Sequence, residues 1–530
     1  MRSCDDPFIR TLASLATDRR EFLRRFALFG VAAIGGRPFP RTRLLRRFSD
    51  NPFTLGVASG DPLHDGVVLW TRLAVDPLAA GGGLPPESVR VAWEIAHDER
   101  FTRIARRGEV TARPASAHAL HVEVDGLEPD RVYWYRFHAG GEVSVIGRTR
   151  TAPSANVPLD EFAFAFASCQ NYEQGFFTAL RHLSEEDIRL VVHLGDYIYE
   201  NGAAEGRPRR HPPNEIRTLE DYRHRHALYR LDGDLQAAHA AAPWIVTWDD
   251  HEVDNNYAAD RDERDTPRDE FLLRRAASYQ AYREHLPLRN AATPRGPDLR
   301  LYRRFRFGPL LEINVLDGRQ YRTDQPCGDG RQRRCEAAYD ERATMLGATQ
   351  EQWLLDGLAA STRRWNMLAN QVPLAQIDNE PGDPASFSMD RWDGYVAARR
   401  RLLGFLGQQA ARAPHNPVVI TGDIHSNWVG ELRTDFDDVR SPVVGVEFIG
   451  TSLSSGGDGS DMSDFGNRAL AANPHLRFFN NQRGYVRCVV SPRHWRADYR
   501  VLDYVSRPGS PVATRASFVI ENGRPGVTSV

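Results

Sequence analysis

The chain contains 530 residues, 41% of them apolar and 26% charged, and this length suits two or three domains. Lys and Arg together number 68 against 70 Asp and Glu, so the formal net charge of -2 gives no polycationic surface for nucleic acid. All of the basic residues are Arg, which excludes phosphate-loop nucleotide hydrolysis, pyridoxal Schiff bases and other lysine-dependent chemistry. The five cysteines form no CxxC zinc pattern, and no apolar run reaches the roughly 18 residues of a stable membrane span.

Residues 1–50 are predicted to form an export signal followed by a basic linker. The segment TDRREFL (17–23) places two arginines ahead of the apolar run 26–36, as in a twin-arginine signal. We therefore expect the twin-arginine translocation machinery as a partner and a periplasmic or secreted protein. A surface helix with an arginine-rich face is the alternative, and the absence of an A-x-A motif leaves the cleavage position open.

Residues 51–155 have the texture of an all-β domain. The runs 67–73, 89–95 and 121–124 alternate apolar and polar residues and are separated by Gly, Pro and Asp turns. The segment 126–137 is similar to the late strands of an immunoglobulin or fibronectin type III sandwich, in which a tyrosine bonds back to the backbone. The run 149–154 is interpreted as a linker to the next domain.

Residues 156–530 are predicted to form an α/β domain. Continuous apolar strands are expected at 162–168, 188–194, 244–248, 311–316, 365–369 and 417–422. Helices are expected at 175–184, 264–285, 349–361 and 394–413. In such a sheet the active residues lie at the carboxyl ends of the strands.

Four of these strand ends carry residues that can bind metals. The segments are ASCQ (167–170), GDYIYE (195–200), TWDDHE (247–252) and GDIH (422–425). A carboxylate after a strand and a glycine projects from a rigid edge, where it can bridge two cations. Tyr199 can return to the same metal as Asp196, and a phenolate oxygen favours Fe(III) over Zn or Mg.

This ordered set resembles the calcineurin-like metallophosphoesterases, and within them the alkaline phosphatase D or phospholipase-D-like branch. Further segments that resemble the branch are LGVASGDP (55–62), LDGRQYR (316–322), DQPCGDG (324–330) and GTSLSSGG (450–457). The resemblance covers about residues 51–501 and the export signal. It implies a four-layer metallophosphoesterase sandwich after the all-β domain.

The resemblance also implies roles for individual residues. The first, ferric site would be held by Cys169, Asp196, Tyr199 and His425. Asp196 would bridge to a second site completed by Asp250 and Asp423. The second set is all oxygen, which favours a hard cation such as Ca²⁺, with Mn, Zn or Mg as divalent alternatives.

The remaining assignments are less specific. Gln371 stands where the superfamily has a histidine ligand, beside Asn370, and which of the two amides points at the metal or at substrate is left open. Arg319 is a candidate for clamping a phosphate oxygen, and Asp249 is expected to lie outside the ligand set. His251 matches the superfamily's general acid.

The resulting prediction is an exported, metal-dependent alkaline phosphatase or phosphodiesterase that acts on phosphate mono- or diesters through a metal-bound hydroxide. Two alternatives stay open: a hydrolase with Cys169 as nucleophile, and a non-catalytic binding protein on a phosphatase fold. Cys327 and Cys335 are expected to form a disulfide in an exported protein. His193 is expected in the core, and a solvated position is expected for His211, His224, His226 and His239.

Overall fold

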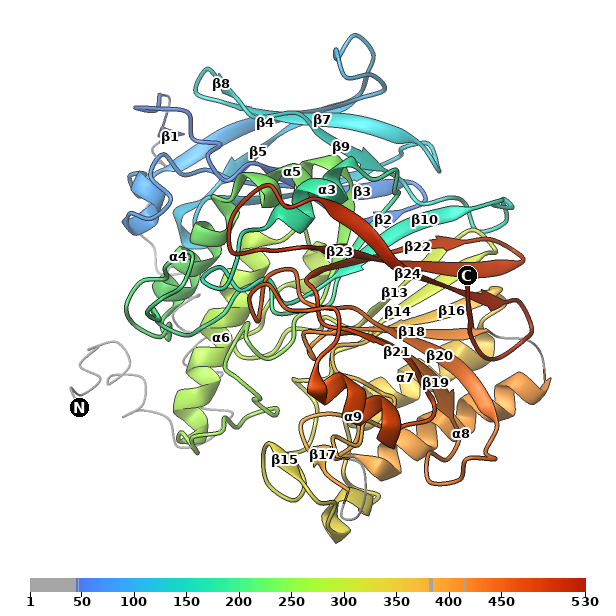
Figure 1. Cartoon of the computed structure of the whole chain (residues 1–530). Helices are drawn as coiled ribbons and strands as arrows, with labels where there is room; N and C mark the ends of the chain where they lie inside the picture. The colour runs from blue at the N-terminus through green and yellow to red at the C-terminus, as the bar shows by residue number, and fades with distance from the viewer. Residues whose placement is uncertain (1–43, 46, 381–384, 413–415) are drawn as a thin grey trace.

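The computed structural model describes residues 44–45, 47–380, 385–412 and 416–530 (Figure 1). The predicted export signal lies outside these residues. Among the helices of the described ranges, none combines the length and the apolar character that crossing a bilayer demands.

Two large sheets form the centre of the molecule (Figure 1). The six continuous apolar strands predicted after residue 156 are all present, as β10 (Phe162–Ala167), β11 (Val191–His193), β12 (Pro243–Val246), β14 (Leu311–Val315), β16 (Trp365–Ala369) and β18 (Pro417–Thr421). The first three are parallel neighbours in a ten-stranded sheet, and the last three are parallel neighbours in a seven-stranded sheet.

Antiparallel strands extend both sheets. The ten-stranded sheet continues through β22 (Gly484–Val490), β23 (His494–Leu502), β24 (Val512–Glu521) and β25 (Thr528–Ser529). The seven-stranded sheet adds β13 (Arg303–Phe307), β19 (Asn427–Arg433), β20 (Val443–Ile449) and β21 (Leu476–Asn480), of which β20 pairs in parallel with β18.

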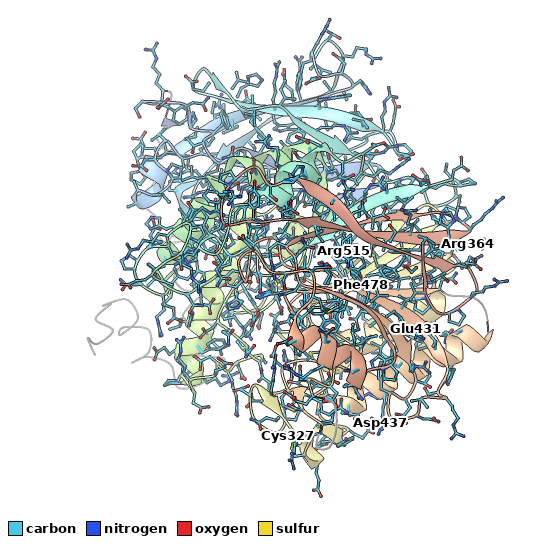
Figure 2. All side chains as sticks on the ribbon, viewed as in Figure 1. Cys327, Arg364, Glu431, Asp437, Phe478 and Arg515 are labelled. Atoms are coloured by element: carbon cyan, nitrogen blue, oxygen red, sulfur yellow. A yellow bond between two sulfur atoms is a disulfide. The ribbon has the colours of Figure 1, made fainter. Side chains whose placement is uncertain are left out.

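Strand β10 shows why the two sheets pack together. Its sequence FAFAFA alternates, and because successive side chains point to opposite faces, the phenylalanines share one face and the alanines the other. Phe164 and Phe166 enter the core between the two sheets, where Trp495 packs against Phe164 at 5.5 Å between ring centroids. Phe478, labelled near the middle of Figure 2, packs against the same core from β21.

Helices cover the outer faces of both sheets. The small alanine face of β10 leaves room for the helices that pack on the ten-stranded sheet, which are α3 (Thr178–Glu185), α4 (Leu219–Arg230), α5 (Gly233–Ala241) and α6 (Arg268–His285). The seven-stranded sheet is covered by α7 (Gly347–Ala360), α8 (Val396–Arg412) and α9 (Asp464–Ala472). The predicted helices are thus present, with boundaries shifted by a few residues.

The N-terminal segment is all β, as predicted, and it shares a sheet with the rest of the chain. Strands β2 (Val57–Leu63), β3 (Gly66–Arg72) and β6 (Ala119–Asp125) continue the ten-stranded sheet, because β2 pairs in parallel with β12. The opposing six-stranded sheet contains β1 (Leu44–Leu45), β4 (Ser88–Ala96), β5 (Ile104–Ala112), β7 (Val132–Ala139), β8 (Glu142–Val143) and β9 (Gly147–Arg150). The expected tyrosine contact is present: the Tyr133 hydroxyl accepts a 2.9 Å hydrogen bond from the Glu128 N–H.

Three of the four histidines predicted to be solvated are buried instead. His226 stacks on His285 with ring centroids 4.9 Å apart, and His239 lies 2.8 Å from the Tyr197 hydroxyl. His211 lies 3.1 Å from the Tyr229 hydroxyl. The arginine-rich sequence around them is misleading, because its helices pack on the sheet, and only His224 is half-buried. His193 is in the core, as predicted.

The close pairing of β2 with β12 gives a test of the shared sheet. A Cβ atom at Gly60 would lie 2.6 Å from the Pro287 carbonyl oxygen and 2.7 Å from that of Trp244. We expect Gly60→Ala to lower the free energy of unfolding by about 1–3 kcal/mol, as overpacking does. The control Gly233→Ala meets no atom within 4 Å, so it should be neutral or stabilising by up to about 1 kcal/mol. Urea unfolding of both variants measures this, and a Gly60→Ala protein as stable as wild type would contradict the close packing.

Candidate metal centre and active site

The polar residues predicted at the strand ends meet where the carboxyl ends of the two sheets adjoin. Cys169 follows β10, Asp196 follows β11, His251 follows β12 and His425 follows β18. The first two loops are joined by backbone hydrogen bonds, since the Cys169 N–H donates to the Gly195 carbonyl at 3.0 Å. Parallel strands in each sheet thus bring together side chains that are up to 256 positions apart in the chain.

Four candidate ligands have left-handed backbone conformations. The φ angles are +60° at Cys169, +54° at Asp196, +65° at Asp423 and +54° at His425. Such a conformation costs a non-glycine residue of order 1–3 kcal/mol and persists only where the surrounding structure enforces it. The clustering of four such residues at one point of the fold marks this point as a functional site.

Glu252 and Gly195 hold the loops after β11 and β12 together. The buried Glu252 carboxylate accepts hydrogen bonds from the backbone N–H groups of Asp196 (3.1 Å), Tyr197 (2.5 Å) and Asp249 (2.8 Å). Gly195 has a φ of +111°, and a Cβ there would lie 2.4 Å from the Asp249 nitrogen. Only glycine therefore allows this approach of the two loops.

A first group of ligand atoms contains sulfur, oxygen and nitrogen. The ligand atoms of Cys169, Asp196 and His425 all lie within 4.8 Å of one another. The Tyr199 hydroxyl donates to Asp196 Oδ2 at 2.8 Å, lies 3.2 Å from His425 Nε2 and accepts from Ser455 Oγ at 2.7 Å. The four residues that the sequence assigned to the first site are thus adjacent.

A second group shares one member with the first. Ligand atoms of Asp196, Asp250 and His251 also lie within 4.8 Å of one another. Asp196 therefore belongs to both groups, which is the arrangement that a bridging carboxylate requires. His251 Nδ1 lies 2.7 Å from Glu200 Oε2, so the imidazole donates there and its other nitrogen stays available.

The acids of the first group are held where their charged forms are disfavoured. Burial raises the pKa of Asp196, Cys169 and Tyr199 well above their usual ranges, and the negative charges around each group raise it further. Burial, with the nearby Arg483, lowers the pKa of His425 to about 3, so its imidazole is neutral. A cation at this position would reverse the effect on the acids, and a neutral imidazole is the form that binds metals.

Three buried oxygen atoms at the site have no hydrogen-bond partner among the described residues: Asp196 Oδ1, Asp249 Oδ2 and Asn370 Oδ1. A buried acceptor without a partner costs about 1–3 kcal/mol, and more when it is charged. Cations satisfy such oxygens directly. The residues present therefore fit a centre that binds cations.

The two amides left open by the sequence are distinguished by their partners. The side-chain amide of Gln371 has hydrogen-bond partners at both ends. Its Nε2 donates to the Leu316 carbonyl (2.7 Å) and to Thr247 Oγ1 (2.9 Å), and its Oε1 accepts from the Gly318 N–H (3.0 Å). Asn370 donates to the Val372 carbonyl and keeps its oxygen unpartnered. Of the two side chains, that of Asn370 has the amide oxygen that could bind a cation, because this oxygen has no hydrogen-bond partner among the described residues.

Arg319 does not have the position predicted for it. It is fully buried, donates to Asp249 Oδ1 at 2.5 Å and forms a two-pronged ion pair with Asp390 at 2.7 and 2.9 Å. A guanidinium with these carboxylate partners and no exposed surface cannot clamp a substrate phosphate. Arg319 instead fixes one oxygen of Asp249, so the predicted substrate role is corrected to that of an internal counter-ion.

Asp423 is not a member of either group of ligand atoms. Its Oδ2 accepts from Arg391 Nε at 2.9 Å, and neither group includes it. Its role as a ligand of the second site stays a prediction.

Sequence reasoning assigned no role to several residues that shape the site. Glu200 orients His251, and Glu252 joins two loops. Ser455 contacts Tyr199, and Arg391 contacts Asp423. Glu200 and Ser455 lie inside the segments GDYIYE and GTSLSSGG, which the sequence had already singled out, whereas nothing in the sequence around position 391 marks Arg391.

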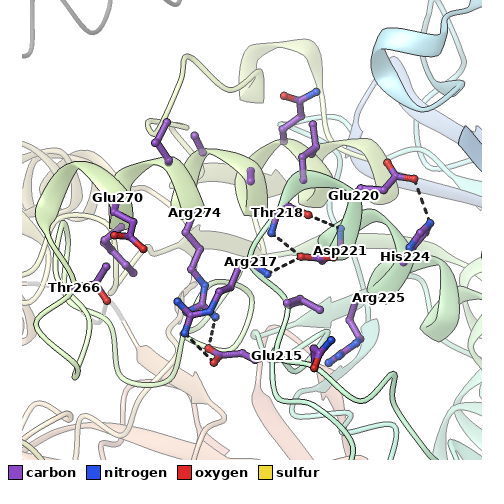
Figure 3. A pocket seen from close by; sticks show the side chains of 18 of the residues that line it. Glu215, Arg217, Thr218, Glu220, Asp221, His224, Arg225, Thr266, Glu270 and Arg274 are labelled. Carbon is purple, nitrogen blue, oxygen red and sulfur yellow. Dashed lines mark hydrogen bonds and ion pairs between the residues drawn. The ribbon is translucent and has the colours of Figure 1, made fainter. Parts of the chain in front are cut away.

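Two cavities differ in their relation to this centre. One of about 1050 Å³ lies beside α4 and α6, where Glu215 and Arg274 form a 2.8 Å ion pair and Thr218 caps α4 (Figure 3). None of the candidate ligands lines it. A smaller cavity of about 410 Å³ is lined by His425 and therefore opens beside the first group.

Comparisons with known proteins identify the family of the chain. Residues 164–499 match the family described as PhoD-like phosphatase, and residues 40–153 match the PhoD-like phosphatase N-terminal domain. Alkaline phosphatase D of Bacillus subtilis (strain 168) is 48% identical over 542 residues, which cover 99% of this chain and 92% of that protein. A solved structure of PhoD is 50% identical, with a TM-score of 0.89 over 92% of this chain and 93% of its own. The chain therefore belongs to the PhoD-like phosphatase family and is a phosphoric ester hydrolase.

Proposed function

We propose that the chain hydrolyses phosphate mono- or diesters at a centre of two cations that share Asp196. The first would be Fe(III), held by Cys169, Asp196, Tyr199 and His425. The second would be a hard cation such as Ca²⁺, held by Asp196 and Asp250 with Asn370 and Asp423. The observation that carries the proposal is the membership of Asp196 in both groups of ligand atoms.

The donor types support these metal identities. A phenolic oxygen and a thiolate suit a ferric ion, and carboxylate and amide oxygens suit calcium, while Mn, Zn or Mg remain divalent alternatives at the second site. When bound, such cations polarise phosphoryl oxygens and lower the pKa of a coordinated water. The chain itself supplies the binding atoms, their orientation and a proton donor.

His251 is the proposed proton donor. Burial lowers the pKa of His251, but Glu200, Asp250 and Asp196 together raise it more, so its net pKa lies well above the usual value. Its Nδ1–H is directed at Glu200, which leaves the other ring nitrogen to donate a proton to the departing alkoxide oxygen. Glu200 thus fixes the ring and stabilises its protonated form.

A cysteine nucleophile is the weaker reading of the same site. Nucleophilic cysteines have a lowered pKa, whereas burial and the neighbouring Asp196 raise the pKa of Cys169. The Sγ atom donates to Ser168 Oγ at 3.2 Å, and no histidine appears among its hydrogen-bond partners in the described chain. The geometry therefore favours Cys169 as a ligand.

We also propose export through the twin-arginine route to the periplasm or the medium. The arginine pair and apolar run before residue 37 support it, as does the disulfide between Cys327 and Cys335, since disulfides persist in oxidising compartments.

The first test concerns the ferric site. Fe(III) bound to a phenolate absorbs visible light, so the protein purified without a metal-affinity tag should be coloured. Tyr199→Phe should remove or strongly shift the band. Tyr197→Phe is the matched control, because Tyr197 is buried in the same loop but its hydroxyl lies beside His239. Absorption spectra and metal analysis measure this, and a colourless, iron-free, fully active wild type would refute the iron assignment.

The second test separates proton donation from metal binding at His251. His251→Ala should keep both metals and lose about 10²–10⁴ in rate on alkyl phosphoesters, with a smaller loss on nitrophenyl phosphate, whose leaving group needs no proton. Glu200→Gln should change the rate in the same direction by less. His224→Ala on α4 serves as the control. Loss of metal from His251→Ala would instead make His251 a ligand of the second group.

The third test concerns export. Replacing Arg19 and Arg20 by lysine should retain the protein in the cytoplasm, because the twin-arginine machinery requires both arginines. Activity measured in fractionated cells reports the location. Unchanged export of the double variant would show that another route is used.

A further inference from the structure

The cavity of about 410 Å³ beside His425 is strongly basic. Among the residues that the structure describes, its lining contains four arginines and no Asp or Glu, namely Arg331, Arg391, Arg468 and Arg483. The remaining lining includes polar residues, the aromatic rings of Phe465 and Phe479, and Ile424. We call these four residues and the space between them the arginine pocket.

Little negative charge within the described ranges neutralises the arginine pocket. Arg483 is buried, and it donates to the carbonyl oxygens of His425 (2.5 Å) and Ser455 (2.9 Å) and to Ser452 Oγ (2.7 Å), but to no carboxylate. Burial lowers the pKa of Arg483 to about 10, which still leaves it charged at neutral pH. A buried cation without a counter-ion is costly unless an anion comes to it.

The other three arginines add to this excess of positive charge. Arg331 lies over the ring of Phe465, 5.2 Å from its centroid, and forms no ion pair with a carboxylate of the described chain. Arg468 approaches Glu380 only at 3.9 Å, and Arg391 is bound to Asp423 at 2.9 Å. Among the described residues, two carboxylates, Glu380 and Asp423, therefore pair with these four guanidinium groups.

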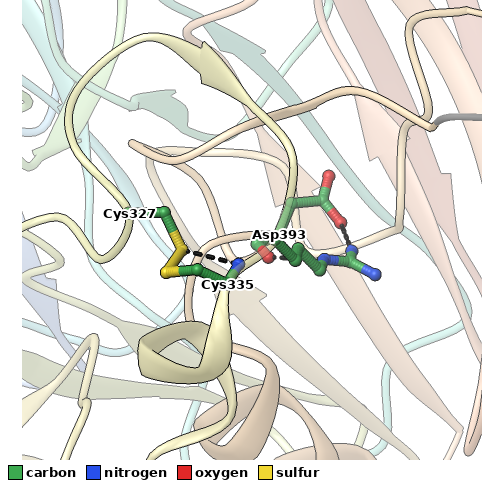
Figure 4. Close-up of a disulfide and its surroundings, with 4 residues drawn as sticks. Cys327, Cys335 and Asp393 are labelled. Atoms are coloured by element: carbon green, nitrogen blue, oxygen red, sulfur yellow. Dashed lines mark hydrogen bonds and ion pairs between the residues drawn. A yellow bond between two sulfur atoms is a disulfide. The ribbon is translucent and has the colours of Figure 1, made fainter.

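The chain holds Arg331 in place through a closed loop. Strand β15 (Arg331–Gln332) pairs with β17 (Phe387–Ser388), with Arg331 opposite Ser388. The disulfide between Cys327 and Cys335 encloses this strand, and Asp393 binds Arg334 of the same loop at 2.5 Å (Figure 4). The arginine is thus presented by a constrained segment, which reduces the entropy lost when it binds a ligand.

Helix α9 adds a favourable dipole. It begins after Ser463, whose side chain accepts a hydrogen bond from the Gly466 N–H, and both Ser463 and Phe465 line the pocket. The positive end of the helix therefore faces the same space as the arginines.

We infer that the arginine pocket binds a second anionic group of the substrate, a phosphate or a carboxylate on the alcohol portion of the ester. His425 belongs to the first group of ligand atoms and also lines the pocket, so one molecule can reach both places. The inference rests on the proposed function, which puts the reacting phosphoryl group beside Asp196 and His425. It narrows the substrate class to esters that carry two anionic groups.

The test measures binding without turnover. Calorimetry on the metal-loaded protein compares alkylphosphonates with bisphosphonates and phosphonocarboxylates that carry two to six carbons between the two groups. At the best chain length, the wild type should bind a compound with two anions about tenfold more tightly than the matched monophosphonate, as charge-assisted hydrogen bonds allow. The bisphosphonate and phosphonocarboxylate series identify which second anion is preferred.

Variants assign the effect to the pocket. Arg331→Gln and Arg468→Gln should each reduce this preference about threefold, as partly exposed ion pairs do, and the double variant should bring it near one. Arg333→Gln is the matched control, since Arg333 is exposed in the same disulfide loop and does not line the pocket. Binding of the monophosphonate should be unchanged in all of them.

The outcomes separate this inference from the proposed function. A wild type without preference for the second anion, or a preference that survives the double variant, would overturn the arginine pocket while monophosphonate binding upholds the proposed centre. Loss of the preference in Arg333→Gln as well would assign it to general charge and also overturn the inference. Failure of the metal-loaded wild type to bind any phosphonate would instead refute the proposed function.

Discussion

The buried carboxylate of Asp196 is the constraint on which the rest of the site depends. It belongs to both groups of ligand atoms, accepts the Tyr199 hydroxyl and has one oxygen without a partner in the described chain. Its backbone is left-handed, and its N–H is bound by Glu252. Burial disfavours the charged form of this carboxylate, and of the two imidazoles near it His425 is neutral, whereas the pKa of His251 is raised in part by Asp196 itself. The geometry and the charge state of both groups of ligand atoms therefore depend on this one side chain.

The scaffold makes this strained arrangement possible. The core between the two sheets receives the phenylalanines of β10, while the alanines of the same strand leave space for helices on the other face. The strand ends are therefore fixed from both sides before their loops begin. Conformations that cost of order 1–3 kcal/mol each, such as those of Cys169 and His425, are tolerable at the rim of so large a core. The packed sheets therefore hold the strained loop conformations in place.

The sequence predicted the buried strands and several of the polar residues that meet at their ends, for a physical reason. Buried parallel strands have a continuous apolar pattern, and polar residues directly after them have to meet at the sheet edge, so Asp196 and His425 are recognisable without a structure. The sequence predictions failed at residues whose role depends on partners far along the chain. Arg319 has the sequence context of a phosphate clamp, yet Asp249 and Asp390 enclose it. The burial of His226 and His239 was hidden by the arginines around them, and the parallel pairing of β2 with β12 has no local signal at all.

The chain has no lysine, and its arginines contribute both to the proposed cation centre and to the proposed anion site. Where a guanidinium is enclosed by carboxylates, as Arg319 is by Asp249 and Asp390, its positive charge is neutralised within the protein, and Asp249 Oδ2 keeps no partner in the described chain. Where it meets only carbonyl and hydroxyl oxygens, as Arg483 does, its charge stays open to an anion. Arg391 and Arg483 line the pocket together with His425, and Arg391 also forms an ion pair with Asp423. A phosphoester with a second anionic group matches both preferences at once: its reacting phosphate faces the cation-binding side, and its other charge faces the arginines.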